Sequence, residues 1–119
     1  LPVAGDNNIG IGLAIASNGE ANFVTVTVRF LGKAQDITGN LTLRLNDNNL
    51  LTLPLINSGL AYIRNSEVAQ GVFMLSSFHK NKVSNSSIKT ISLKLSDNLI
   101  RTYEGEMNTG VLMKQVKCL

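Results

Sequence analysis

The sequence contains one histidine, His79, and any histidine-based catalysis would depend on it. A serine nucleophile needs such a base beside it, with a carboxylate to hold the base in place. Ser76 and Ser77 lie too close to His79 in the sequence to form a nucleophile elbow around it, and the chain has no G-x-S-x-G motif. A triad would have to be completed in space, by Asp36 or Asp97. We therefore expect His79 to be a solvated loop residue beside two lysines.

Three further side chains are of types that could take part in chemistry. Cys118 is the single cysteine, so an intrachain disulfide is impossible, and the thiol would react only in an electropositive, partly open site. We expect it to pack as a small hydrophobic residue. Glu104 and Glu106 stand two apart, which places both carboxylates on one face of a strand. They precede a predicted helix, where acidic groups are commonly solvated, so we expect no acid–base role for them.

Two clusters of oxygen-bearing side chains, Asn46–Asn49 and Ser96–Asn98, interrupt apolar segments. A calcium loop needs more carboxylates at fixed offsets than either cluster provides, so both predict turns. Gly10 and Gly12 lack the third glycine and the following helix of a phosphate-binding loop. We accordingly expect no catalytic, cofactor-binding or metal-binding residue, no cofactor, and a protein that is not an enzyme.

Alternation of apolar and polar residues is the main structural pattern of the chain, and it predicts half-buried strands. In the hairpin around the first turn, Leu43 and Leu53 are expected to be buried together. Pro54 indicates an edge position there, because proline has no N–H to donate to a ladder. The predicted strands are Phe23–Phe30 (with Val24, Val26 and Val28 on one face), Leu41–Leu45, Leu50–Leu55, Gly59–Ile63, Gly71–Leu75, Lys89–Leu95 and Leu99–Tyr103.

The two predicted hairpins resemble each other along the sequence. Leu43–Asn48 aligns with Leu93–Asn98, and Thr52 then falls at the position of Thr102. Two interpretations remain open: a duplicated half-domain, or separate hairpins that share the same turn chemistry.

The first twenty residues have a pattern of their own. Ile9–Ala16 alternates strictly between large and very small residues, which predicts a strand with one bulky face and one bare face. A bare face allows another backbone or a side-chain layer to approach closely. Residues 1–20 are therefore either the first strand of the domain, returning through Ser17–Glu20, or an extension that needs a partner. We favour the first.

Two short helices are expected beside the strands. Ser76 or Ser77 can cap a helical turn that carries Phe78 and Val83 inward. Near the C-terminus, Asn108 or Thr109 can cap a helix that runs to about Leu119. Its apolar face, which must dock on the sheet, comprises Val111, Leu112, Val116 and Leu119.

These elements predict one mainly β domain over residues 1–119, an antiparallel β-sandwich or curved sheet of about seven to eight strands with a short C-terminal helix. The net charge is +3, but the basic residues are scattered singly and have no aromatic stacking ladder, which argues against a nucleic-acid partner. No apolar run is long enough to span a membrane.

Three segments, Gly71–Ser77, Ile88–Leu93 and Leu112–Leu119, are similar in patterning to small exported β proteins of the Bacteroidetes type. In those proteins a strand, a short helical turn, a long hairpin and a closing helix follow in that order. The resemblance covers residues 71–119 and implies export and an all-β core. It transfers no functional residue.

We therefore expect a non-catalytic exported or envelope-associated module that binds a protein or a glycan. It would be secreted, periplasmic or on the cell surface after removal of a signal sequence. An alternative is a self-assembling subunit, a homo-oligomer that exchanges the strand Ile9–Ala16 with a neighbour. A third hypothesis is a small enzyme that uses His79.

Overall fold

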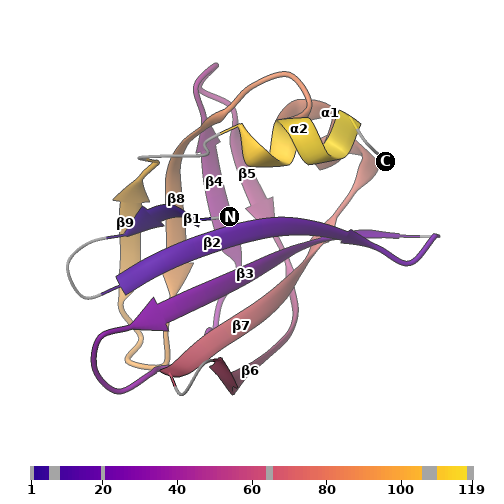
Figure 1. The fold of residues 1–119 in the computed structure, drawn as a ribbon. Helices are drawn as coiled ribbons and strands as arrows, with labels where there is room; N and C mark the ends of the chain where they lie inside the picture. Colours follow the sequence, from indigo (N-terminus) through magenta and orange to yellow (C-terminus); the bar gives the residue numbers. More distant parts are fainter. Residues whose placement is uncertain (1, 6–8, 20, 64–65, 106–109, 118–119) are drawn as a thin grey trace.

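The computed structural model describes residues 2–5, 9–19, 21–63, 66–105 and 110–117, and its strands form two antiparallel sheets that pack face to face (Figure 1). The first sheet has the strand order β1-β2-β3-β7-β6 and the second the order β5-β4-β8-β9. The predicted mainly β, antiparallel fold is confirmed. The strands are β1 (Pro2–Gly5), β2 (Ile9–Ser17), β3 (Asn22–Phe30), β4 (Leu41–Leu45), β5 (Leu50–Leu53), β6 (Leu55–Ile63), β7 (Ser66–Leu75), β8 (Ile88–Lys94) and β9 (Ile100–Glu104).

The described residues form nine strands rather than seven to eight, because β1 was not expected. The predicted strand Leu50–Leu55 is wrong in its second half. β5 ends at Leu53, and Leu55 begins β6 in the other sheet. The crossing occurs at Pro54, whose missing N–H interrupts the ladder while its carbonyl accepts the Met74 N–H at 3.0 Å. Pro54 thus adjoins an edge strand, as expected, and also switches the chain between sheets.

The core lies between the two sheets and follows the alternation of the sequence. In β3, Val24, Val26 and Val28 are fully buried while Arg29 is exposed. Leu43 and Leu53 are also fully buried, as predicted. Each such side chain contributes about 1.5–3 kcal/mol relative to an exposed position. The largest fully buried residues come from both sheets, from α2 and from the isolated bridge between Ile37 and Leu95, and include Phe73, Ile11, Leu13, Ile37, Leu41, Leu43, Leu45, Leu53, Ile91, Leu95 and Leu112.

Two short helices, α1 (Ser77–Val83) and α2 (Val111–Lys117), cover one end of the sandwich (Figure 1). The Ser76 side chain caps α1 by accepting the His79 N–H at 3.2 Å. Val83 is buried as predicted, but the inward placement of Phe78 is wrong, since its side chain is 64% exposed. Residues five apart on an α-helix point about 140° apart, so a single turn cannot direct both at the core. The predicted caps Asn108 and Thr109 and the helix end at Leu119 lie outside the described residues.

The segment Ile9–Ser17 is a strand of its own domain, paired with β1 on one side and β3 on the other. β1 covers only the Gly10–Gly12 part of its first edge. Farther along this strand, the side-chain oxygen of Gln115 in α2 accepts the Ile15 N–H at 2.7 Å. The helix thereby satisfies a backbone donor for which β1 is too short.

Candidate functional site

His79 does not form a catalytic group with the residues that the sequence offered. It lies on α1 rather than in a loop and is half-buried, and burial lowers its pKa below the ordinary 6.5. Its ring meets the Phe78 ring edge-on, with 5.9 Å between the ring centres. The Nδ1 atom has no hydrogen-bond partner among the described residues. No carboxylate of the described chain therefore orients this imidazole, as a general base would need.

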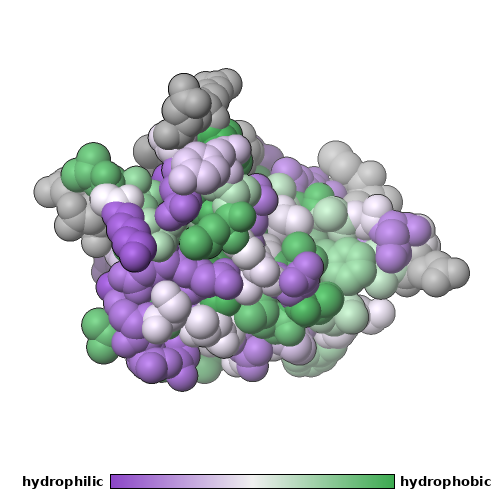
Figure 2. Space-filling model, turned by 90° about the horizontal axis from the view of Figure 1, so that it is seen from below, coloured by the Kyte–Doolittle hydropathy of each residue, from purple (hydrophilic) through white to green (hydrophobic). Residues whose placement is uncertain are grey.

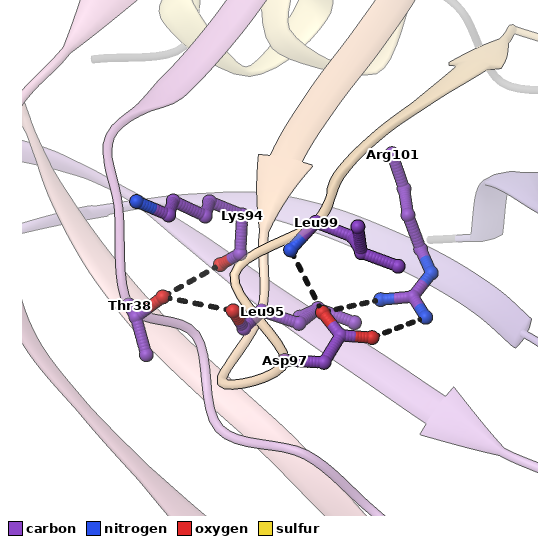
Figure 3. Close-up of polar contacts among 6 residues, drawn as sticks. All are labelled: Thr38, Lys94, Leu95, Asp97, Leu99 and Arg101. Atoms are coloured by element: carbon purple, nitrogen blue, oxygen red, sulfur yellow. Dashed lines mark hydrogen bonds and ion pairs between the residues drawn. The ribbon is translucent and has the colours of Figure 1, made fainter.

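The two carboxylates considered for a triad have other partners. Asp36 Oδ1 accepts the Ile37 N–H at 2.8 Å. Asp97 lies in the β8–β9 turn (Figure 3), where Arg101 reaches its carboxylate with an N–O distance of 2.7 Å and the Leu99 N–H donates to it at 3.0 Å. The Arg101 hydrogen bond, followed by that of Leu99, holds the Asp97 pKa below its ordinary value. This turn and α1 lie at opposite ends of the sandwich (Figure 1), so Asp97 stabilises a turn.

The other reactive side chains offer no assembled site. Glu104 is exposed at the end of β9. Glu106 and Cys118 lie outside the described residues. Within the described ranges, no three His, Cys, Asp or Glu side chains come together as a metal site, and no helix is long and apolar enough to cross a membrane.

The bare face of β2 does form a distinct feature. Gly10, Gly12 and Ala14 lie on the side of the sheet that faces away from the core, since Ile11 and Leu13 between them are buried. Across the ladder these small residues pair with Arg29, Thr27 and Thr25 of β3, respectively. Side chains on β3 therefore stand beside a strip of nearly bare backbone. This difference in height makes a hollow on the outer face of the five-stranded sheet.

The hollow is a groove of about 440 Å³. We call it the sheet groove. Its lining comes from β2, from both neighbours of β2 and from the end of β6. The residues are Pro2, Gly10, Ile11, Gly12, Leu13, Ala14, Thr25, Thr27, Arg29 and Ile63. A second, smaller hollow of about 230 Å³ lies over β6 and β7, between Asn57–Leu60, Gln70 and Val72.

Arg29 is the charged member of the groove lining among the described residues. Its guanidinium is exposed and has no ion pair within the described part of the chain. Thr27 lies two residues away on the same strand face, about 6.6 Å along the strand. The Thr25 hydroxyl donates to the Ala14 carbonyl at 3.3 Å, which ties the groove floor together. The groove thus combines small apolar walls with one unpaired cation at its side.

Val68 shows that the outer face of this sheet is partly covered. It pairs with Arg29 of β3 and Ala61 of β6, on the face opposite the core, and yet it is fully buried. It is not part of the main core cluster. Side chains therefore cover Val68 on the outer face beside the groove, where Ile63 of β6 also lies.

The sheet groove is a feature that the sequence did not predict. The strict large–small alternation of Ile9–Ala16 did predict a bare face, which was the available indication. The alternation does not give the register in which β2 pairs with β3. The pairing of Gly12 with Thr27 places the β3 side chains beside the bare strip. In the sequence alone, Arg29 is one of several basic residues scattered singly along the chain.

No family model matches the chain, and no curated protein matches it. Among solved structures, the fold is similar to the crystal structure of a DUF4426 family protein from Pseudomonas aeruginosa PAO1, with a TM-score of 0.42 and 11% sequence identity. The match covers 87% of this chain and 93% of that one. The resemblance to exported proteins of the Bacteroidetes type stays a prediction.

Proposed function

We propose that this chain is a non-catalytic binding module, and that the sheet groove takes an apolar ligand bearing one carboxylate. The observation that carries the proposal is Arg29, a cation without an ion pair among the described residues, beside walls that are otherwise apolar or hydroxyl-bearing. Guanidinium groups bind carboxylates through two parallel N–H···O bonds, and such charge-assisted bonds are roughly twice as strong as neutral ones. An apolar acid would place its carboxylate at Arg29 and its chain over Gly10, Gly12 and Ala14.

The size and lining of the groove support this class of ligand. A volume of about 440 Å³ falls within the range of roughly 300–1,000 Å³ typical of small-molecule sites. The side chains of Thr25, Thr27 and Arg29 are the polar ones in the described lining. A glycan presents many hydroxyls that each need a partner when buried, and three side chains would leave most of them unpaired. The groove therefore favours an amphipathic acid over the glycan considered from the sequence.

Two observations support a module without catalysis. Nucleophile, base and carboxylate do not meet around His79, and the groove lining contains no histidine, cysteine, aspartate or glutamate among the described residues. A groove that holds a ligand beside a single arginine can bind and release it, but it offers no group to accept a proton at neutral pH.

An exported or envelope location belongs to the same proposal. Its support is the low content of charged residues, 16%, which leaves Asn, Ser and Thr to form most of the polar surface. Fractionation of cells that make the full-length natural protein tests it. Recovery with the cytoplasmic fraction alone would contradict an envelope location and leave the groove proposal untouched.

Binding of decanoate below its micelle concentration, measured by isothermal titration calorimetry, tests the groove. Decanoate should bind, whereas decyl glucoside, with the same chain and no charge, should bind at least about tenfold more weakly, as expected when a charge-assisted pair worth roughly 1.5–3 kcal/mol is lost. Arg29→Gln should reduce decanoate affinity by a similar factor and leave decyl glucoside unaffected.

Arg44→Gln is the matched control, since Arg44 is also an exposed strand arginine but belongs to β4 of the other sheet. This variant should bind decanoate like the unaltered protein. Equal losses in the two arginine variants would indicate a general effect of net charge and would overturn the groove as the site. Absence of decanoate binding to the unaltered protein would overturn the ligand class.

A further inference from the structure

The four outer edges of the two sheets differ in how well they are protected against pairing. β1 is four residues long and contains Pro2, and β5 is four residues long and is followed by Pro54. β9 has five residues and carries Arg101 and Glu104. Short length, proline and charge are the devices that keep edge strands from pairing with other chains. β6 is longer and contains neither proline nor charge; its ladder with β7 shifts register between Leu55 and Asn57, next to Pro54.

β6 (Leu55–Ile63) is nine residues long, with no charged residue and no proline. It also carries large apolar side chains that the second sheet does not cover. Ile56, Leu60 and Tyr62 are 49%, 47% and 76% exposed, three of the nine large hydrophobic residues exposed in the described chain. On the end of the molecule seen in Figure 2, hydrophobic residues gather across the middle and right, and hydrophilic ones cover much of the left. The other six exposed large hydrophobic residues of the described chain lie singly or as the adjacent pair Leu99–Ile100. Only in β6 do three of them share one strand.

The backbone of β6 has polar groups directed away from β7. The Ser58 N–H donates to Oδ1 of the neighbouring Asn57 at 2.9 Å rather than to β7. Backbone groups alternate sides along an antiparallel strand, so Leu60 and Tyr62 direct theirs outward as well. Among the described residues no strand pairs with this edge. The Asn57 side chain thus occupies the place of one acceptor that a further strand would supply.

We propose that β6 pairs antiparallel with β6 of a second copy of this chain, around a two-fold axis at Gly59. Aligning the nine-residue strand with itself places Ser58 opposite Leu60, two residues that both direct backbone groups outward. Each N–H then reaches the other copy's carbonyl, as in any hydrogen-bonded antiparallel pair. Gly59 meets its own copy at the axis, where no atom lies within 4 Å of the position of an added Cβ.

A second copy fits this edge better than a foreign strand because the strand complements itself. An isologous contact uses the same patch on both partners, and an uncharged strand meets no like charge when it faces its own copy. In this register Tyr62 of one copy faces Ile56 of the other, which lies at the register shift between Leu55 and Asn57. Aromatic and β-branched residues form favourable cross-strand pairs, and both side chains are largely exposed in the single chain.

The pairing would join the two five-stranded sheets into one continuous sheet. A two-fold axis perpendicular to that sheet leaves both outer faces on the same side. The sheet groove belongs to β2 and β3, so it stays open in each copy and does not depend on the interface.

Sedimentation equilibrium over a broad range of concentrations tests the pairing. The unaltered protein should shift from the mass of one chain to that of two. Tyr62→Lys and Leu60→Lys should each weaken association by about tenfold or more, because a charged lysine on an edge strand opposes pairing with another strand. Leu60→Pro should act similarly without changing net charge, since it removes an outward N–H and no bond to β7.

Ile100→Lys is the matched control, a 71% exposed residue on the edge strand of the other sheet. It should associate like the unaltered protein, and unchanged circular dichroism spectra should show that all variants are folded. The proposal is overturned if the unaltered protein remains a single chain at every concentration, as it would if β6 binds a strand of another protein. It is equally overturned if the β6 variants associate normally, or if Ile100→Lys weakens association as much as Tyr62→Lys.

Discussion

Asn48 and Asn98 occupy equivalent positions in the two hairpin turns of the four-stranded sheet. Their φ angles are 68° and 65°, and each backbone N–H donates at 2.9 Å to the leucine three residues earlier, Leu45 or Leu95. In both turns the preceding aspartate accepts the N–H two residues on, at 3.1 Å for Asp47 and 3.0 Å for Asp97. The sequence similarity of the hairpins therefore extends to their hydrogen bonds. Duplication and shared turn chemistry both remain open as its origin.

The left-handed backbone at these turns predicts which substitutions they tolerate. Asn98→Val should lower the free energy of unfolding by about 1–2 kcal/mol, because a β-branched residue is strained at positive φ. Asn98→Gly is the control, since glycine adopts this conformation freely and should cost little or nothing. Urea denaturation measures both. Equal stability of the two variants would mean that the turn can relax to another conformation.

Leu43 in β4 is a second test of the fold. Leu43→Ala should lower the free energy of unfolding by about 2–5 kcal/mol, as other truncations of fully buried leucines do. Leu50→Ala in the same hairpin is the control, because Leu50 is 57% exposed and should cost about 0.5 kcal/mol or less. Urea unfolding of both variants measures the difference. A small loss at Leu43 would indicate a wrong register for β4.

His79 predicts a pH dependence of stability. Burial lowers its folded-state pKa below 6.5, so the unfolded chain binds a proton at a pH where the folded chain does not. The free energy of unfolding should therefore fall as the pH drops through 6.5, and level off below the folded pKa. His79→Gln should abolish this slope, because His79 is the single histidine of the chain.

At pH 8 His79→Gln should change the free energy of unfolding by only about 0.5 kcal/mol. The histidine and the glutamine that replaces it are both uncharged at this pH, and the imidazole of His79 is partly exposed. Urea midpoints at a series of pH values give both results. Stability that rises on acidification through pH 6.5 would contradict the lowered pKa.

The sheet groove can be filled without disturbing the fold. No atom lies within 4 Å of the position of a Cβ added to Gly10, so Gly10→Leu should project into open groove space and leave the melting temperature nearly unchanged. Decanoate affinity should fall by about tenfold or more, as when a ligand loses most of its apolar contact. Gly32→Leu, also with open space around it but away from the groove, should bind normally. Unchanged binding to Gly10→Leu would place decanoate elsewhere.

Local patterns were sufficient to predict most strands and both turns. Alternation identifies the buried face of β3 through Val24, Val26 and Val28, and Asn48 and Asn98 supply the turn chemistry. The same patterns carry no information about which sheet a strand joins. Leu51–Leu55 alternates without interruption, and the change of sheet at Pro54 follows from β6 pairing with β7. Such pairings depend on packing between distant segments, as with Val26 and Gly71.

The candidate site depended on the same distant pairings. The bare strip of β2 was visible in the sequence, but the groove exists only because β3 places threonines and Arg29 beside it. The prediction that Phe78 points into the core was wrong for a local reason. A short helix presents one face to the core, and Val83 lies on that face while Phe78 does not.

The position of β7 between β3 and β6 has a consequence for how the chain folds as it is synthesised. β1, β2 and β3 form a continuous meander that can pair as soon as it is made, but β3 then has an open edge. Its permanent neighbour begins only at Ser66, after the strands β4 and β5 of the other sheet. Until then a valine-rich strand edge is available to any other nascent chain. Slow folding, dominated by contacts between distant residues, and a need for protection from aggregation before β7 emerges both follow from this order.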